Sequence, residues 1–195
     1  NTMEEFKEVK DTRPRGTLAR QERRTKNKPI EIDAIQTTEE LRFYTGISEL
    51  DRVLGGGAVR GSFVLVGGEP GIGKSTLLLQ MCQEMCRQAK VLYVSGEESL
   101  RQIRLRADRL HISSPALFVL AETDLDEIIE EIGLLQPDVL IVDSIQTIYK
   151  SDLTSAPGNT TQIKECAMTL MQYAKRHNVT IFIVGHVNKE GTLAG

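Results

Sequence analysis

A glycine-rich run followed by a lysine and two hydroxyl residues is the part of this sequence best suited to chemistry. It fits the pattern G-x-x-x-x-G-K-[ST], which binds nucleotide phosphates when a strand precedes it and a helix follows. Glycines let backbone N–H groups approach the phosphate oxygens, Lys74 would reach the β- and γ-phosphates, and Ser75 would offer its hydroxyl to Mg²⁺. The predicted nucleotide-binding residues are Gly68, Glu69, Pro70, Gly71, Ile72, Gly73, Lys74, Ser75 and Thr76. A glycine-rich turn without a ligand explains the glycines but not the lysine that a hydroxyl residue follows, so a nucleotide triphosphatase is the leading hypothesis.

Acidic residues follow two other apolar runs of strand length. Asp143 comes directly after the run at 139–142 and has the position of a Walker B carboxylate, which would hold Mg²⁺ opposite Ser75. Capping of a turn is the alternative for Asp143. Glu97 and Glu98 follow the run at 91–95, and a carboxylate there could orient the attacking water. We predict Glu97 as this base, with Glu98 as its substitute; either could instead lie in the first turn of the next helix.

Polar residues also follow the last apolar run, at 180–184. His186 is placed to make a hydrogen bond that differs between bound ATP and bound ADP, so we predict a γ-phosphate sensor. An ordinary loop histidine is the alternative. Lys189 is a further candidate to reach a phosphate, in its own subunit or in a neighbouring one.

Apolar runs alternate with helical patterns along most of the chain. Strands are predicted at 62–66, 91–95, 117–120, 139–142 and 180–184, and helices near 49–54, 74–88, 99–110, 124–134 and 160–177. Ser48 is the predicted cap of the first helix. This alternation predicts an α/β fold with a mostly parallel central sheet flanked by helices, in which ligands bind at the carboxyl ends of the strands.

The composition is that of an ordinary globular protein. The chain has 195 residues, a formal net charge of −3, and 40% hydrophobic and 26% charged residues. No apolar run is long enough to span a membrane and the polar N-terminus does not resemble a secretory signal, so we expect a cytoplasmic location. The cysteines form no C-x-x-C pair, and core packing is their expected role. Residues 1–29 are basic and are interpreted as a linker, with contact to a nucleic-acid backbone as the alternative.

Several motifs resemble those of the bacterial RadA family, also called Sms. They are TGISELDRVLGGG at 45–57, the phosphate loop, YVSGEES at 93–99, DSIQT at 143–147, LTSAPG at 153–158 and GHVNKEGTLAG at 185–195. The resemblance implies a RecA-like core at 43–195 after a linker and entrance segment at 1–42. It also implies a ring hexamer acting in DNA repair and recombination, a DnaB-like helicase that migrates branched DNA, and a possible RecA-type recombinase as partner.

The resemblance also implies where individual residues lie. The strand ending at Val184 should lie beside the phosphate-loop strand, which would bring His186 close to the γ-phosphate. The loop at 149–161 and the loop after His186 would contact single-stranded DNA, through Lys150, Asn159, Lys164 and Lys189. Arg104 is the candidate for stacking on adenine, with a solvated helix charge as the alternative.

Parts of the family pattern do not occur in this sequence. These are the four-cysteine zinc module, the KNRFG motif and the domain resembling Lon protease, so zinc is expected only in a module outside this sequence. The sequence begins with Asn rather than Met, and we expect a fragment of a longer protein whose phosphate-loop strand forms an exposed sheet edge. Two other classes remain open: a nucleotide-dependent switch resembling KaiC, and a strand-exchange filament like RecA.

Overall fold

The computed structural model describes residues 29–34 and 41–186. The chain divides into two compact units, residues 1–37 and 38–195. In the first unit, the described part holds one short 3₁₀ helix, Ile32–Ala34, without buried residues. Among the helices that the structure describes, none has both the length and the hydropathy of a membrane span.

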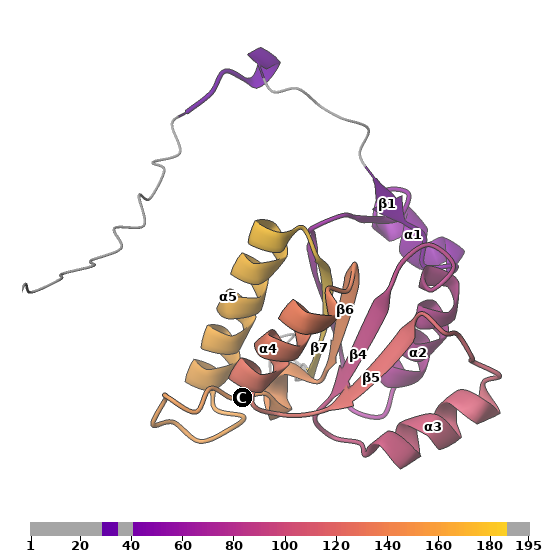
Figure 1. Ribbon diagram of the computed structural model, residues 1–195, viewed down its shortest axis with the longest axis vertical. Helices are drawn as coiled ribbons and strands as arrows, with labels where there is room; N and C mark the ends of the chain where they lie inside the picture. Colours follow the sequence, from indigo (N-terminus) through magenta and orange to yellow (C-terminus); the bar gives the residue numbers. More distant parts are fainter. Residues whose placement is uncertain (1–28, 35–40, 187–195) are drawn as a thin grey trace, which may run out of the picture. The chain divides into compact units, whose positions relative to one another are not determined.

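A five-stranded parallel sheet forms the centre of the second unit (Figure 1). Its strands are β3 (Phe63–Gly68), β4 (Val91–Ser95), β5 (Leu117–Ala121), β6 (Val139–Asp143) and β7 (Thr180–His186), arranged in the order β3-β7-β6-β4-β5. The predicted α/β class is confirmed, and so is the position of β7 beside the phosphate-loop strand β3. The predicted strand ends differ from the observed ends by at most two residues.

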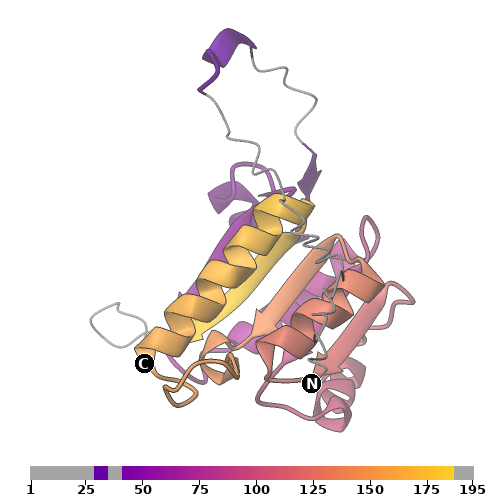
Figure 2. The same cartoon turned by 60° about the vertical axis from the view of Figure 1, so that its left-hand side comes forward.

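Helices cover both faces of this sheet, because each parallel strand is joined to the next through a helical crossover. The helices are α2 (Lys74–Met85), α3 (Leu100–Arg109), α4 (Leu125–Leu135) and α5 (Thr160–His177). One core cluster joins α2 and α3 to the sheet, and a second joins α4 and α5 to its other face. Figure 2 shows α4 and α5 side by side over that second face.

The central strands β4 and β6 are buried along their whole length. Successive side chains point to opposite faces, so Tyr93 packs in the cluster under α2 while Leu92 and Val94 pack in the cluster under α4 and α5. This burial on both faces explains why the sequence shows continuous apolar runs rather than alternation.

The entrance segment contains a two-stranded antiparallel sheet, β1 (Arg42–Phe43) and β2 (Ala58–Val59), and the helix α1 (Ser48–Val53). The prediction that Ser48 caps this helix was wrong. Ile47 is at the N-cap position and Ser48 is the first helical residue, without a side-chain cap bond. Thr45 and Asp51 organise the turn instead, since the Asp51 carboxylate accepts hydrogen bonds from the backbone N–H and the hydroxyl of Thr45, both at 2.8 Å.

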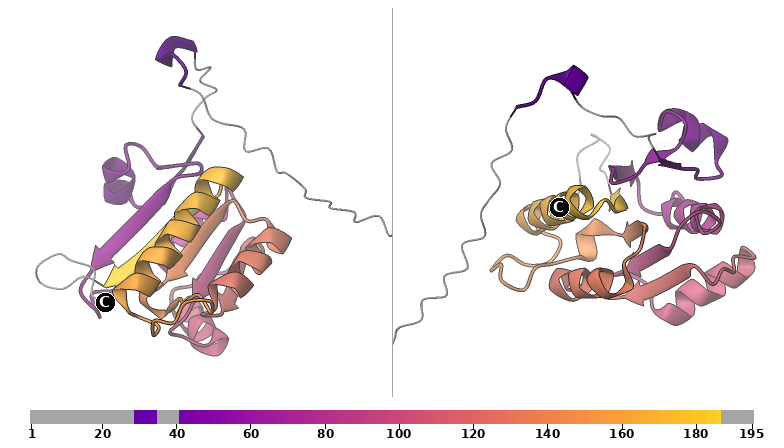
Figure 3. Two further views of the ribbon diagram at one scale, coloured as in Figure 1. Left: turned by 90° about the vertical axis from the view of Figure 1, so that its left-hand side faces the viewer. Right: turned by 45° about the horizontal axis from the view of Figure 1, so that its top comes forward.

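The strand β3 lies at one edge of the sheet, as predicted. Among the strands that the structure describes, it pairs with β7 alone (Figure 3). Leu65 in this strand is 47% exposed, whereas every residue of β7 up to Gly185 is buried. The outer backbone of β3 is therefore a template for pairing with a further strand.

Candidate functional site

The predicted phosphate loop connects β3 to α2 and has the backbone of an anion-binding loop. Gly71 and Gly73 have φ angles of 79° and 98°, in the left-handed region that favours glycine, and Gly73 is the N-cap residue of α2. The first N–H groups of α2 are free of helical partners and carry its positive dipole end, which attracts anions.

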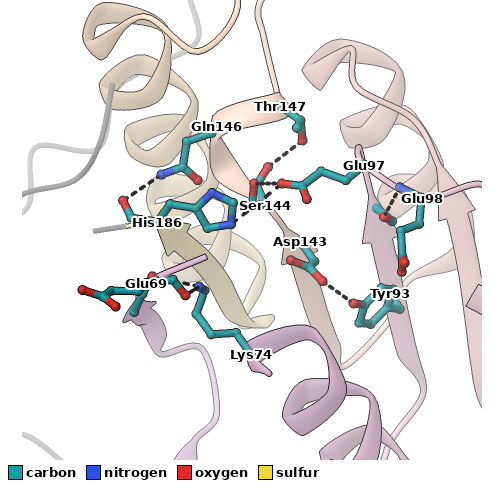
Figure 4. Close-up of polar contacts among 12 residues, drawn as sticks. Glu69, Lys74, Tyr93, Glu97, Glu98, Asp143, Ser144, Gln146, Thr147 and His186 are labelled. Carbon is teal, nitrogen blue, oxygen red and sulfur yellow. Dashed lines mark hydrogen bonds and ion pairs between the residues drawn. The ribbon is translucent and has the colours of Figure 1, made fainter. Parts of the chain in front are cut away.

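Lys74 begins α2 and bends back over the loop. Its side chain is largely buried, and its Nζ donates to the carbonyl oxygens of Gly68 at 2.8 Å and Glu69 at 2.7 Å. The ammonium is therefore held at the end of β3, where the loop curves around it (Figure 4). Glu69 contributes its backbone oxygen to this arrangement.

The register of the sheet brings the other predicted residues to the same edge. Asp143 ends β6 opposite Ser95 of β4, and His186 ends β7 opposite Gly68 of β3. Because parallel strands end together, residues far apart in sequence meet at the carboxyl edge. Figure 4 shows Lys74, Glu97, Asp143 and His186 gathered there.

Asp143 is almost completely buried. One of its two carboxylate oxygens, Oδ2, accepts a hydrogen bond of 2.5 Å from the hydroxyl of Tyr93. Burial of the phenol and the neighbouring Asp143 carboxylate raise the pKa of Tyr93 well above its usual value. The hydroxyl therefore keeps its proton and remains a donor.

The chemistry around Asp143 fits a bound divalent cation. Within the described ranges, no cationic side chain makes an ion pair with this buried carboxylate, and burying an unpaired charge is costly. A carboxylate and the Ser75 hydroxyl are hard oxygen ligands, which Mg²⁺ prefers. Among the described residues no cluster of three or more His, Cys, Asp or Glu could hold a metal, so the protein would supply few ligands and phosphate and water oxygens the rest.

Glu97 and Glu98 have different surroundings. The Oε1 of Glu97 accepts a 2.7 Å hydrogen bond from the Ser144 hydroxyl, and His186 Nε2 lies 3.9 Å from the same oxygen. Glu98 instead pairs with Arg106 at 2.5 Å, in a contact that leaves both side chains 24% exposed. The carboxylate of Glu98 is thus already engaged.

A short 3₁₀ turn, η2 (Ile145–Thr147), connects these residues. The Thr147 hydroxyl donates to the Ser144 carbonyl at 2.7 Å, and Gln146 Nε2 donates to the His186 carbonyl at 3.2 Å. Thr147 also occupies the space where a Cβ on Gly96 would lie. The turn therefore joins the ends of β4, β6 and β7.

The phosphate loop, the proposed base Glu97 and the proposed sensor His186 line one cavity of about 270 Å³. Its lining residues are Pro70, Gly71, Gly73, Lys74, Ser75, Thr76, Glu97, Arg106 and His186. Arg104 is not among them, because it forms an ion pair with Asp108 at 2.8 Å and lines a separate apolar cavity beside Leu100 and Ile103. Adenine stacking by Arg104 stays a prediction.

A larger cavity, of about 420 Å³, lies at the opposite end of the sheet and is lined by residues such as Arg60, Asp138 and His177. Arg60 and Asp138 are paired with each other there at 2.9 Å. The 270 Å³ cavity is the better candidate, since it combines the phosphate loop with a carboxylate and a histidine.

Four residues at this site escaped the sequence interpretation: Tyr93, Arg106, Ser144 and Gln146. Tyr93 belongs to an apolar run and begins the YVSGEES segment, but neither pattern indicates a partner for its hydroxyl. Ser144 and Gln146 belong to the DSIQT segment, and their polar character directly after a buried strand was the signal available.

The predicted DNA-contacting loop at 149–161 is ordered by Gln162 of α5. The Gln162 amide donates to the carbonyls of Lys150 and Ser155, and its oxygen accepts from the Lys150 N–H. Asn159 caps α5 through the Thr161 N–H, whereas Lys164 is exposed on α5. Lys189 and the loop after His186 lie outside the described residues.

Comparison with protein families matches residues 27–192 to a family described as AAA domain. The chain belongs to this family. The match covers the phosphate loop, Glu97, Asp143 and His186, so the site described above lies within the AAA domain. Together, the family and the phosphate loop identify an ATP-hydrolysing domain.

The chain is also similar to proteins named DNA repair protein RadA. It is 55% identical to the one from Bacillus subtilis (strain 168) over 172 residues, which are 88% of this chain and 38% of that protein. It is 49% identical to the one from Halalkalibacterium halodurans over 194 residues, 99% of this chain and 42% of that protein. The predicted resemblance to the RadA family is confirmed, and the chain spans about two fifths of the length of these curated relatives.

Proposed function

We propose that this AAA domain hydrolyses ATP to drive movement along DNA in repair and recombination. The observation that carries the chemical part is the placement of Glu97 across one cavity from the phosphate loop, with its carboxylate held by Ser144. The RadA proteins, which are named for DNA repair, support the biological part.

Each residue has a separate task in the proposed reaction. The N–H groups of the loop and the Lys74 ammonium bind the phosphates and offset their charge. Glu97 orients the attacking water and accepts its proton, and His186 senses whether the γ-phosphate is present. Glu97 is preferred over Glu98 because the latter is engaged by Arg106.

Ser75 and Asp143 would hold Mg²⁺ in this proposal. The ion would neutralise charge that develops on the phosphate oxygens. Ser75 lines the cavity, and the buried Asp143 carboxylate accepts the hydrogen bond from Tyr93.

The coupling to DNA would run through η2. This turn contacts Glu97 through Ser144 and contacts the end of β7 through the bond from Gln146 to His186, and the loop at 149–161 follows it directly. A change at the γ-phosphate would therefore reach that loop over a short path. A helicase that migrates branches as a homo-hexameric ring, with a RecA-type recombinase as partner, is the finer form of the proposal.

The test is ATP hydrolysis by the intact protein alone, with single-stranded DNA and with branched DNA. Lys74→Ala serves as the blank, because it removes the charge next to the phosphates. We expect DNA to raise the rate of ATP hydrolysis, and we expect Lys74→Ala to show no hydrolysis. Turnover that is indifferent to both single-stranded and branched DNA would contradict the translocase proposal and favour a nucleotide-dependent switch. Equal turnover in Lys74→Ala would contradict the site.

A further inference from the structure

The buried hydroxyl of Tyr93 faces the carboxylate that the proposed function assigns to Mg²⁺. Tyr93 is 1% exposed, and its ring packs in the core cluster between the sheet and α2. Its hydroxyl donates a hydrogen bond to Asp143 Oδ2 at 2.5 Å. The two residues are 50 positions apart and lie on adjacent strands of the sheet.

The register explains why this pair forms. Asp143 lies opposite Ser95, and Tyr93 is two residues before Ser95 on the same face of β4. The long phenol extends along this face and reaches the carboxylate from below the carboxyl edge. A phenylalanine would fill the same space and leave Oδ2 without a partner in a buried position.

We propose that Tyr93 is a positioning residue for the Mg²⁺ site, because its hydroxyl occupies one oxygen of Asp143 and turns the other toward the phosphate loop. This inference rests on the proposed function, in which Asp143 holds Mg²⁺. Partners that hydrogen-bond to a metal ligand fix the ligand's orientation, and losing one costs about 10- to 100-fold in metal affinity.

A purely structural role would give a different outcome. If the hydrogen bond from the Tyr93 hydroxyl contributed only to the stability of the fold, its removal would lower stability. It would then weaken nucleotide binding to the same extent with and without Mg²⁺. If it positions Asp143, its removal changes the dependence on Mg²⁺ selectively.

The experiment measures binding of a fluorescent ADP analogue to the intact protein during a Mg²⁺ titration, and again in excess chelator. The variant is Tyr93→Phe. The matched control is Tyr173→Phe, which makes the same change on α5, where Tyr173 stacks on His177 away from the phosphate loop. Thermal unfolding of each sample shows that it is folded.

For Tyr93→Phe, we expect the half-saturating Mg²⁺ concentration to rise about 10- to 100-fold, with metal-free binding unchanged. Tyr173→Phe should match the unmutated protein. In an Asp143→Asn background, Tyr93→Phe should have no further effect, because the residue acts through that carboxylate.

An unchanged Mg²⁺ dependence in folded Tyr93→Phe would overturn the inference, and so would an equal loss of binding with and without Mg²⁺. If Tyr93→Phe does not fold on its own, the comparison is made in the Asp143→Asn background, where a further shift in Mg²⁺ dependence would likewise overturn it. Absence of nucleotide binding by the unmutated protein would overturn the proposed function itself, which keeps the two failures distinct.

Discussion

The Ser144 hydroxyl donates a 2.7 Å hydrogen bond to Oε1 of Glu97. Ser144 is completely buried and follows Asp143 directly. The residue that bonds the proposed base is therefore next in sequence to the proposed metal ligand. The bond engages one carboxylate oxygen of Glu97 and leaves the other for the attacking water.

Ser144→Ala should therefore lower the rate of ATP hydrolysis without weakening ATP binding. A base that is free to rotate loses its alignment, and misplacement of about 1 Å can cost about 100-fold, so we expect a loss of 10- to 100-fold in kcat. Steady-state kinetics measure it, with exposed Ser113→Ala as the control. An unchanged kcat would show that Glu97 is positioned by other contacts.

The two adjacent glutamates should respond differently to neutralisation. Glu97→Gln should leave ATP binding intact and reduce turnover by about 10²- to 10⁴-fold, the usual contribution of a general base. Glu98→Gln breaks the pair with Arg106 but should retain most of the turnover. Single-turnover hydrolysis and equilibrium binding separate the two effects. The reverse ranking would transfer the base to Glu98.

Gly96→Ala tests the contact between the end of β4 and η2. A methyl group at this position would collide with the Thr147 side chain, so η2 or the end of β4, next to Glu97, would have to shift. We expect a loss of about 1 to 3 kcal/mol in unfolding free energy, together with reduced turnover.

Gly133→Ala on α4 is the matched control for that change, because nothing lies within 4 Å of its added Cβ. It should stabilise the protein by about 0.5 to 1 kcal/mol, since alanine loses less backbone freedom on folding. Denaturant unfolding measures both variants. If Gly96→Ala and Gly133→Ala had the same unfolding free energy, η2 would have to move away from the added methyl group without loss of stability.

The three cysteines should differ in their reactivity toward iodoacetamide. Burial raises the pKa of Cys166 to about 11 and that of Cys82 well above its usual value. Because the thiolate is the reactive form and only about 0.1% of Cys166 is ionised at pH 8, its alkylation should be slow. Burial also raises the pKa of Cys86, but this thiol is only partly buried and should be alkylated first. Peptide mass spectrometry follows the order, and denaturant should abolish it.

Much of the fold followed from local patterns in the sequence. The apolar runs predicted all five strands of the sheet to within two residues. For β4, β6 and β7 the reason is that a parallel strand buried on both faces must be apolar throughout. The start of α2 was also predicted, since the glycine at 73 and the lysine at 74 belong to one local motif. The cap of α1 was missed because the first helical hydrogen bond runs from the Asp51 N–H to the Ile47 carbonyl, which places the N-cap one residue before Ser48.

The sequence by itself determined which chemical groups are present: the phosphate loop, the glutamates after β4, the aspartate that ends β6 and the histidine that ends β7. Only the tertiary structure decided how they are connected. It assigned Ser144 to Glu97, Arg106 to Glu98 and Tyr93 to Asp143. Two of these contacts join residues 47 and 50 positions apart, and they exist because strand register sets adjacent strand ends side by side.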